Sequence, residues 1–176
     1  MPILDIERGV IVLRIVYDGP PFAGKTTSVR ALARSLGRTS FSGDEAEGRT
    51  LQFDWLDYVG GRFEGYPIRC QILSVPGQDT LAARRRRILR TADSVIFVAD
   101  SRQERLDASL HSLSELRQFL AACGEPQPAI VLQANHRDAG SAVSLAKIRS
   151  RLAVGPTVPV AESVASDGVG IRETFV

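Results

Sequence analysis

The apolar residues of this chain fall into short runs that alternate with segments of helical spacing. Residues 10–17 (VIVLRIVY) form a β-branched run of strand length, and residues 26–36 repeat their apolar positions with the period of a helix. The alternation returns in the second half of the chain. There we predict strands at 94–100, 129–134 and 158–161, and helices at 106–122 and 144–152.

The middle of the chain follows a different pattern. Residues 37–50 (GRTSFSGDEAEGRT) have no apolar period, which predicts a loop. Two candidate strands follow at 51–59 and 64–75, and the stretch 60–63 between them (GGRF) is typical of a hairpin turn. A helical segment at 81–94 (LAARRRRILRTADS) leads into the later alternation.

This order of elements predicts an α/β fold. We expect a mostly parallel sheet with one antiparallel edge strand and helices on both faces, formed by a single domain over residues 1–176. The segment 170–176 (GIRETFV) is typical of the first turns of a C-terminal helix, which we expect to be cut short.

Such sheets bind ligands outside the carboxyl ends of their strands. Five loops of this sequence begin at those ends, and we expect them to lie along one rim. They contain Gly19, Gly77, Asp100, Asn135 and Ala165.

Composition narrows the classes of function. With 176 residues, 44% hydrophobic and 24% charged, the chain is long enough for one core. Its N-terminus lacks an apolar run of signal or membrane length, so we expect a soluble cytoplasmic protein. The net charge of +2, without aromatic residues among the basic ones, does not indicate nucleic-acid binding. Cys70 and Cys123 lack the spacing of a metal site, and we expect both to be reduced core residues.

The strongest chemical signal is GPPFAGKTT, residues 19–27, which lies between a predicted strand and a predicted helix. In such phosphate loops backbone N–H groups surround the phosphates, the lysine reaches the terminal phosphates, and the next hydroxyl coordinates magnesium. Lys25 and Thr26 hold these positions. Because Lys25 and Lys147 are the only lysines among 22 basic residues, a chance match is rare.

Six segments together resemble a known family. GPPFAGKTT, GRTLQFDWLDY, SVPGQ, VIFVADSRQERLDASLHSLSELRQFL, NHRD and AESVASDGVG occur in the order seen in the bacterial Ras-like GTPases of the MglA type. Those are the small G proteins of gliding-motility polarity. The resemblance covers nearly the whole chain and implies a Ras-like G domain that binds GTP or GDP with Mg²⁺.

The resemblance also implies the residues that bind nucleotide. They are Gly19, Phe22, Ala23, Gly24, Lys25, Thr26, Thr27, Thr50, Gly77, Asn135, His136, Asp138 and Ala165. Asp138 would accept hydrogen bonds from N1 and N2 of guanine, Asn135 would tie its loop to the phosphate loop, and the Ala165 N–H would donate to guanine O6. His136 stands where the family has lysine, which implies weaker guanine affinity.

By the same resemblance, catalysis would depend on Gln78, Arg49 and Lys25, and magnesium would be held by Thr26 and Thr50. Gln78 would orient the attacking water. Arg49 would act as an arginine finger supplied from within the chain, stabilising charge on the transferred phosphoryl group.

Two further positions depart from the wider Ras pattern. Ser74 replaces an aspartate near the magnesium shell, and Pro21 replaces a glycine that faces the γ-phosphate and Gln78. Proline lacks an N–H, but in the Ras-like pattern the donors run from Phe22 to Thr26, so we expect binding to survive. The proline ring would crowd the attacking water and slow turnover.

Three functions remain open. The first is a slow GTPase switch in cell polarity or motility, with a roadblock-type regulator and unidentified effectors as partners. The second is a nucleotide-binding scaffold with little or no hydrolysis, and the third is a small-molecule kinase that uses ATP. The arginine run at 84–87 fits either a solvated helix surface or contact with an acidic partner, because a helix spreads consecutive residues around its circumference.

Overall fold

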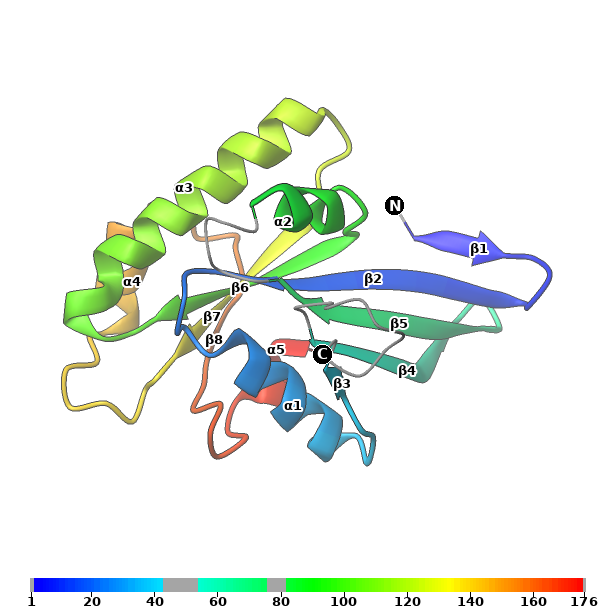
Figure 1. The fold of residues 1–176 in the computed structure, drawn as a ribbon, viewed down its shortest axis with the longest axis horizontal. Coiled ribbons are helices and arrows are strands. Elements are labelled where there is room, and N and C mark those ends of the chain that lie inside the picture. The colour runs from blue at the N-terminus through cyan, green and yellow to red at the C-terminus, as the bar shows by residue number, and fades with distance from the viewer. Residues whose placement is uncertain (1, 43–53, 76–81, 176) are drawn as a thin grey trace.

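A computed structural model describes residues 2–42, 54–75 and 82–175, and Figure 1 shows the arrangement of its helices and strands. The strands are β1 (Ile3–Asp5), β2 (Val10–Asp18), β3 (Phe41–Ser42), β4 (Asp54–Phe63), β5 (Tyr66–Ser74), β6 (Ser94–Asp100), β7 (Ala129–Asn135) and β8 (Val160–Glu162). The helices are α1 (Lys25–Ser35), α2 (Ala82–Leu89), the 3-10 turn η2 (Gln103–Arg105), α3 (Leu106–Cys123), α4 (Leu145–Arg151) and α5 (Ile171–Phe175).

The strands form one sheet in the order β3-β4-β5-β2-β6-β7-β8, with β1 added beside β2. β5, β2, β6, β7 and β8 pair in parallel, whereas β4 runs antiparallel to β5. The predicted mostly parallel sheet with an antiparallel edge is confirmed. Since the parallel strands share one direction, their carboxyl ends meet at one rim, where Asp100 pairs in register with Asn135.

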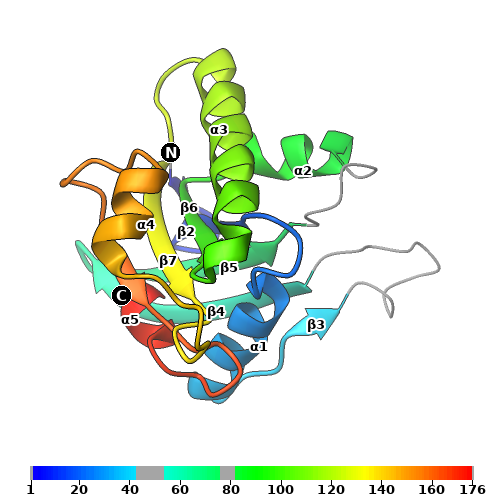
Figure 2. The same ribbon diagram turned by 90° about the vertical axis from the view of Figure 1, so that its left-hand side faces the viewer.

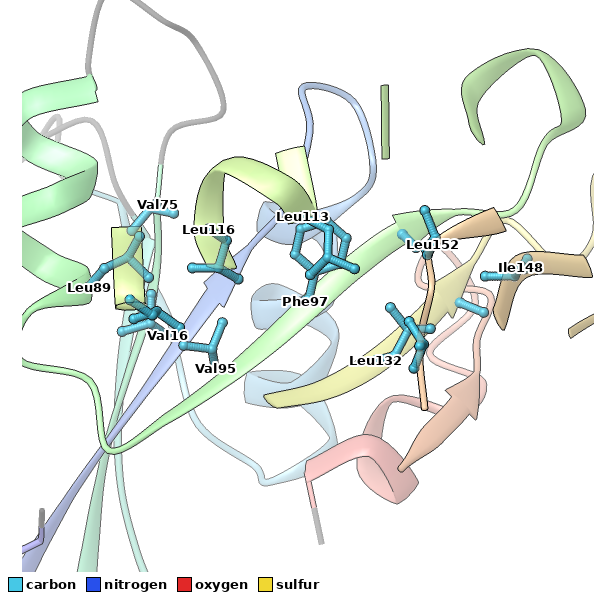
Figure 3. Packing of buried hydrophobic residues seen from close by; sticks show 14 of the residues in the cluster. Val16, Val75, Leu89, Val95, Phe97, Leu113, Leu116, Leu132, Ile148 and Leu152 are labelled. Atoms are coloured by element: carbon cyan, nitrogen blue, oxygen red, sulfur yellow. The ribbon is translucent and has the colours of Figure 1, made fainter. Parts of the chain in front are cut away.

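Helices cover both faces of the sheet (Figures 1 and 2). α2, α3 and α4 cover one face, and α1 and α5 cover the other. The central strand β6 serves both layers because successive side chains point to opposite faces. Its Phe97 packs with Leu113 and Leu116 in the cluster of Figure 3, while Ile96 and Val98 pack toward α1.

The predicted hairpin turn at 60–63 is wrong. β4 continues through both glycines to Phe63, and its register against β5 shifts between Val59 and Arg62. The turn lies at Glu64 and Gly65, whose φ angles are 49° and 84°. Two successive residues with positive φ are typical of a tight hairpin turn. Gly60 and Gly61 instead lie at the irregularity within β4.

The strands β1 and β3 and the exposure of Cys123 differ from the sequence predictions. The short strands β1 and β3 both pair antiparallel with their neighbours, and neither has an apolar run long enough to predict it. Cys70 is buried in the core as expected, but Cys123 is exposed at the end of α3. Among the described residues, we find no helix that is both long and apolar enough to span a membrane.

The packing of Phe97 generates a stability prediction. Its side chain is fully buried between β6 and α3, so Phe97→Ala should lower the free energy of unfolding by about 3–5 kcal/mol through lost burial and a residual cavity. Phe63→Ala is the matched control, because Phe63 is 60% exposed and its loss should cost less than about 0.5 kcal/mol. Chemical denaturation at equal nucleotide content measures both, and equal losses would contradict the assigned core.

Candidate functional site

The phosphate loop connects the carboxyl end of β2 to α1 and has two positions where a side chain does not fit. Gly19 has φ 142°, and a Cβ there would lie 2.3 Å from the Val98 carbonyl oxygen. Gly24, at the N-cap of α1, has φ 100°, and a Cβ would lie 2.2 Å from Asn135 Nδ2. Glycine is therefore required at both ends of the loop for steric and conformational reasons.

The first turn of α1 is suited to bind an anion. Within this described helix no side chain caps the N-terminal N–H groups, and its first turn contains no acidic residue. Uncapped N–H groups and the helix dipole both favour a negative charge at this end. Thr26 is half-buried and Thr27 is exposed in this turn, so their backbone and hydroxyl groups lie at the predicted phosphate site.

Lys25 is buried and folds back onto its own loop. Its Nζ donates to the Gly19 carbonyl at 2.7 Å and to the Pro20 carbonyl at 2.8 Å. Burial lowers the pKa of Lys25 to about 8; the negative charge of Asp18 opposes this effect, and the positive charge of Arg85 adds to it. A bound phosphate would stabilise the protonated form of Lys25 more than the neutral carbonyls of Gly19 and Pro20 do.

Phe22, in the phosphate loop, and His136, directly after β7, both have an unusual backbone conformation. Phe22 has φ 65° and a side chain that is 82% exposed, and His136 has φ 60°. Positive φ is costly for a bulky residue, so contacts must maintain it. His136 Nε2 lies 3.2 Å from the Phe22 carbonyl oxygen, and Arg105 donates to the Pro21 carbonyl at 3.0 Å. These two side chains brace consecutive peptides of the phosphate loop.

Asn135 connects the phosphate loop to the last predicted base loop. Its Nδ2 donates to the Ala23 carbonyl at 2.8 Å, and its Oδ1 accepts from the Ala165 N–H at 2.9 Å and from Ser163 Oγ at 3.1 Å. The side chain is almost wholly buried. This is the structural role predicted for Asn135, but the Ala165 N–H donates to it here, so a guanine O6 would have to share that donor.

Three polar residues that the sequence analysis missed support this connection. Gln133 Nε2 donates to Ser28 Oγ at 2.8 Å and to Ser163 Oγ at 3.0 Å, and Ser28 Oγ donates to the Gly24 carbonyl. All three side chains are buried. The available signal was Gln133 itself, a polar residue within the apolar run of β7, because buried polar groups need partners.

Asp100, predicted on the same rim, forms an ion pair with Arg102. Its buried carboxylate accepts from Arg102 Nε at 2.9 Å and from a terminal nitrogen of Arg102 at 2.6 Å. Burial acts to raise the pKa of Asp100, but the hydrogen bonds from Arg102 outweigh it and hold that pKa below its usual value. Asp100 thus remains ionised and fixes the turn that carries Arg105.

The remaining predicted residues divide into two groups. Asp138 is exposed in the loop after β7, and Ser74 is buried at the end of β5 in register with Tyr17. Arg49, Thr50, Gly77 and Gln78 lie outside the described residues. In the described ranges no group of three or more His, Cys, Asp or Glu side chains is placed to hold a metal.

Buried Lys25 makes phosphate binding depend on pH. Below about pH 8 the lysine is protonated both free and bound; above it, the free protein must take up a proton to bind. We expect GDP affinity to fall by up to about tenfold per unit as pH rises from about 8 to about 9. Calorimetry in buffers of different ionisation enthalpy should detect proton uptake at about pH 9 and little at about pH 7.

Lys147→Ala provides the control for this measurement. Lys147 is the other lysine of the chain and is exposed on α4, so its removal should leave the proton uptake unchanged. Uptake that is equal at both pH values, or that disappears with Lys147, would contradict the assignment to Lys25.

Comparison with known proteins agrees with this geometry. No protein-family model matches the chain. The mutual gliding-motility protein MglA of Myxococcus xanthus (strain DK1622) is 36% identical over 182 residues, covering 99% of this chain and 92% of that protein. Because the alignment covers 99% of this chain, it spans the sheet, the phosphate loop and the loops of the rim. The chain therefore belongs to the MglA family of bacterial Ras-like small GTPases.

Proposed function

We propose that this protein is a molecular switch that binds GTP with Mg²⁺ and hydrolyses it slowly to GDP. The observation that carries the proposal is the uncapped first turn of α1 beside buried Lys25, a site whose N–H groups and ammonium need an anionic partner. Membership of the GTPase family supports GTP and GDP as that partner.

Guanine selectivity would reside in the loop that follows β7. Asp138 is exposed and able to accept hydrogen bonds from N1 and N2 of guanine, a donor pair that adenine lacks. Asn135 fixes the start of this loop through its bond to Ala23. His136 replaces the family lysine, and its contact with the Phe22 carbonyl suggests that it supports the phosphate loop rather than adding charge at the base.

Magnesium and hydrolysis would depend on residues from several loops. Thr26 and Thr50 would supply hydroxyl oxygens, which suit Mg²⁺, and Gly77 would donate its N–H to the γ-phosphate. Gln78 would orient water, while Arg49 and Lys25 would stabilise negative charge on the transferred group. When bound, the ion would supply positive charge that stabilises the phosphate oxygens.

Two neutral replacements support slow turnover. Ser74 offers a hydroxyl where an aspartate would bring charge to the metal's water shell. By the family pattern, Pro21 would place its ring near the γ-phosphate, and the bond from Arg105 to the Pro21 carbonyl would restrain that peptide. These replacements also favour the second candidate, a nucleotide-binding scaffold with little or no hydrolysis.

The cellular role is proposed from the relative. The similar protein is named for mutual gliding motility, and we propose a related role in polarity or motility here. The partners would be a roadblock-type regulator that stimulates hydrolysis, together with effectors that recognise the GTP-bound form. We place this activity in the cytoplasm, where GTP is available.

The first test is nucleotide selectivity. Calorimetry should show binding of GDP and GTP, stronger GTP binding with Mg²⁺ than without, and weak binding of ATP. Asp138→Asn should weaken GDP binding by about a hundredfold or more, because the new amide places a donor opposite a guanine donor. Glu125→Gln removes a carboxylate at the far end of α3 and should leave affinity unchanged. Equal ATP and GTP binding would instead favour the small-molecule kinase.

The second test is single-turnover hydrolysis of bound GTP. Arg49→Ala and Gln78→Leu should each slow phosphate release, by roughly a hundredfold or more for the arginine. Pro21→Gly should accelerate it by removing the ring beside the water. Nucleotide affinity should change little in all three variants, because the backbone donors of the loop are retained.

Tight GTP binding without phosphate release over hours, in the wild type and in Pro21→Gly, would reject the GTPase and leave the scaffold. An unchanged rate in Arg49→Ala would remove that residue from catalysis. An unchanged rate in Pro21→Gly, with or without a stimulating partner, would show that the proline ring does not limit turnover.

A further inference from the structure

Asp18 is a buried carboxylate at the base of the phosphate loop. It is the last residue of β2, directly before Gly19, and its side chain is wholly inaccessible to solvent. Burying an ionised carboxylate is costly unless a charged partner forms hydrogen bonds with it. The residue that meets this requirement comes from another element.

That partner is Arg85, in the middle of α2. Its Nε donates to Asp18 Oδ1 and a terminal nitrogen donates to Asp18 Oδ2, both at 2.8 Å. A second terminal nitrogen contacts Glu115 of α3 at 3.2 Å. The guanidinium therefore joins β2, α2 and α3, and it forms the bidentate pair that arginine makes best with a carboxylate.

Arg85 remains charged in this setting. Burial acts to lower its pKa, but the hydrogen bonds and negative charges of Asp18 and Glu115 raise that pKa above its usual value. The Arg85 side chain is 16% exposed. Arg86 and Arg87, its neighbours in the arginine run, are exposed instead, as helical geometry requires for consecutive residues. The prediction of a solvated surface is thus correct for these two and wrong for Arg85.

The apolar packing of α2 against the rest of the protein lies at its C-terminal end, where Ile88 packs against the core. Among the residues of α2, all of which are described, Leu89 is the fully buried one, and it lies at the C-terminal end of the helix. The Asp18–Arg85 pair adds a charged, hydrogen-bonded contact earlier in the helix, nearer to the segment that contains Gln78. Gln78 precedes Ala82, the first residue of α2, by four positions.

We propose that Asp18 and Arg85 are a positioning pair that anchors α2 to the base of the phosphate loop, and that hydrolysis requires this anchor. The inference rests on the proposed GTPase function. Gly19, which follows Asp18, accepts a hydrogen bond from Lys25 Nζ. Two adjacent residues, Asp18 and Gly19, thus bind Arg85 of α2 and Lys25 of the phosphate loop, respectively. The position of α2 set in this way fixes the point at which the segment containing Gln78 ends.

The test uses Arg85→Gln, Asp18→Asn and the double variant, with hydrogen exchange of residues 82–90 in the GDP-loaded protein as the first readout. Arg85→Gln leaves Asp18 unpaired and should destabilise the fold, whereas the double variant removes both charges and should recover stability. Exchange in α2 should remain about tenfold or more faster than wild type in the double variant, because Gln and Asn cannot form the bidentate pair.

The second readout is single-turnover GTP hydrolysis beside GDP affinity. Hydrolysis should fall about tenfold or more in the double variant, while GDP affinity changes less than about threefold. Arg85→Lys keeps the charge and hence the fold, but it lacks the guanidinium fork, so it should show the same two defects in weaker form. Arg87→Gln, the same change at an exposed position of α2, should behave as wild type.

Recovery of stability, α2 protection and hydrolysis together in the double variant would overturn the proposal, because the pair would then be merely structural. Wild-type exchange in α2 of both the double variant and Arg85→Lys would overturn it as well. Failure of the proposed function gives a different result. In that case the wild type binds no GTP or never releases phosphate. The hydrogen-exchange comparison would still decide whether the Asp18–Arg85 pair anchors α2.

Discussion

The buried amide of Asn135 is the interaction on which the rest of the site depends. One side chain satisfies the Ala23 carbonyl of the phosphate loop and the Ala165 N–H of the last rim loop. Its amide also lies where a Cβ on Gly24 would be, so the same group that holds the loop requires glycine at the N-cap of α1. A glycine cap leaves the helix N–H groups without a side-chain partner. The anion site thus follows from how Asn135 packs.

The phosphate loop contains backbone strain that contacts from other loops offset. Phe22 of this loop and His136, directly after β7, both have positive φ. His136 and Arg105 instead brace adjacent carbonyls, and a peptide whose carbonyl is fixed on one side presents its N–H on the other. Local strain is therefore offset by contacts from two separate loops. The Ala23 N–H donates to the Pro20 carbonyl at 3.4 Å, a bond that it would have to release to donate to a phosphate.

Much of this could be predicted from sequence, for physical reasons that differ by residue. Lys25 could be predicted because a phosphate-loop lysine acts at a fixed place between a strand and a helix. The role of Asn135 was implied by the resemblance of NHRD to the family's base-recognition loop. The turn at Glu64 was missed because Gly60 and Gly61 tolerate a strand irregularity as well as a turn. Asp18 and Arg85 were missed because 67 positions separate them, and only the packed fold shows that they meet.

Two of the buried carboxylates at this rim, Asp18 and Asp100, show what arginine provides there. Asp18 and Asp100 end neighbouring parallel strands close to a site for a polyanion, where unpaired negative charge would oppose binding. Each is matched by one bidentate guanidinium, from Arg85 and Arg102 respectively. A lysine would contact one oxygen at a time and would lose its proton more readily when buried. Because a guanidinium neutralises each of these carboxylates, the N-terminus of α1 and Lys25 make the site positively charged. Arg85, which neutralises Asp18, also holds α2.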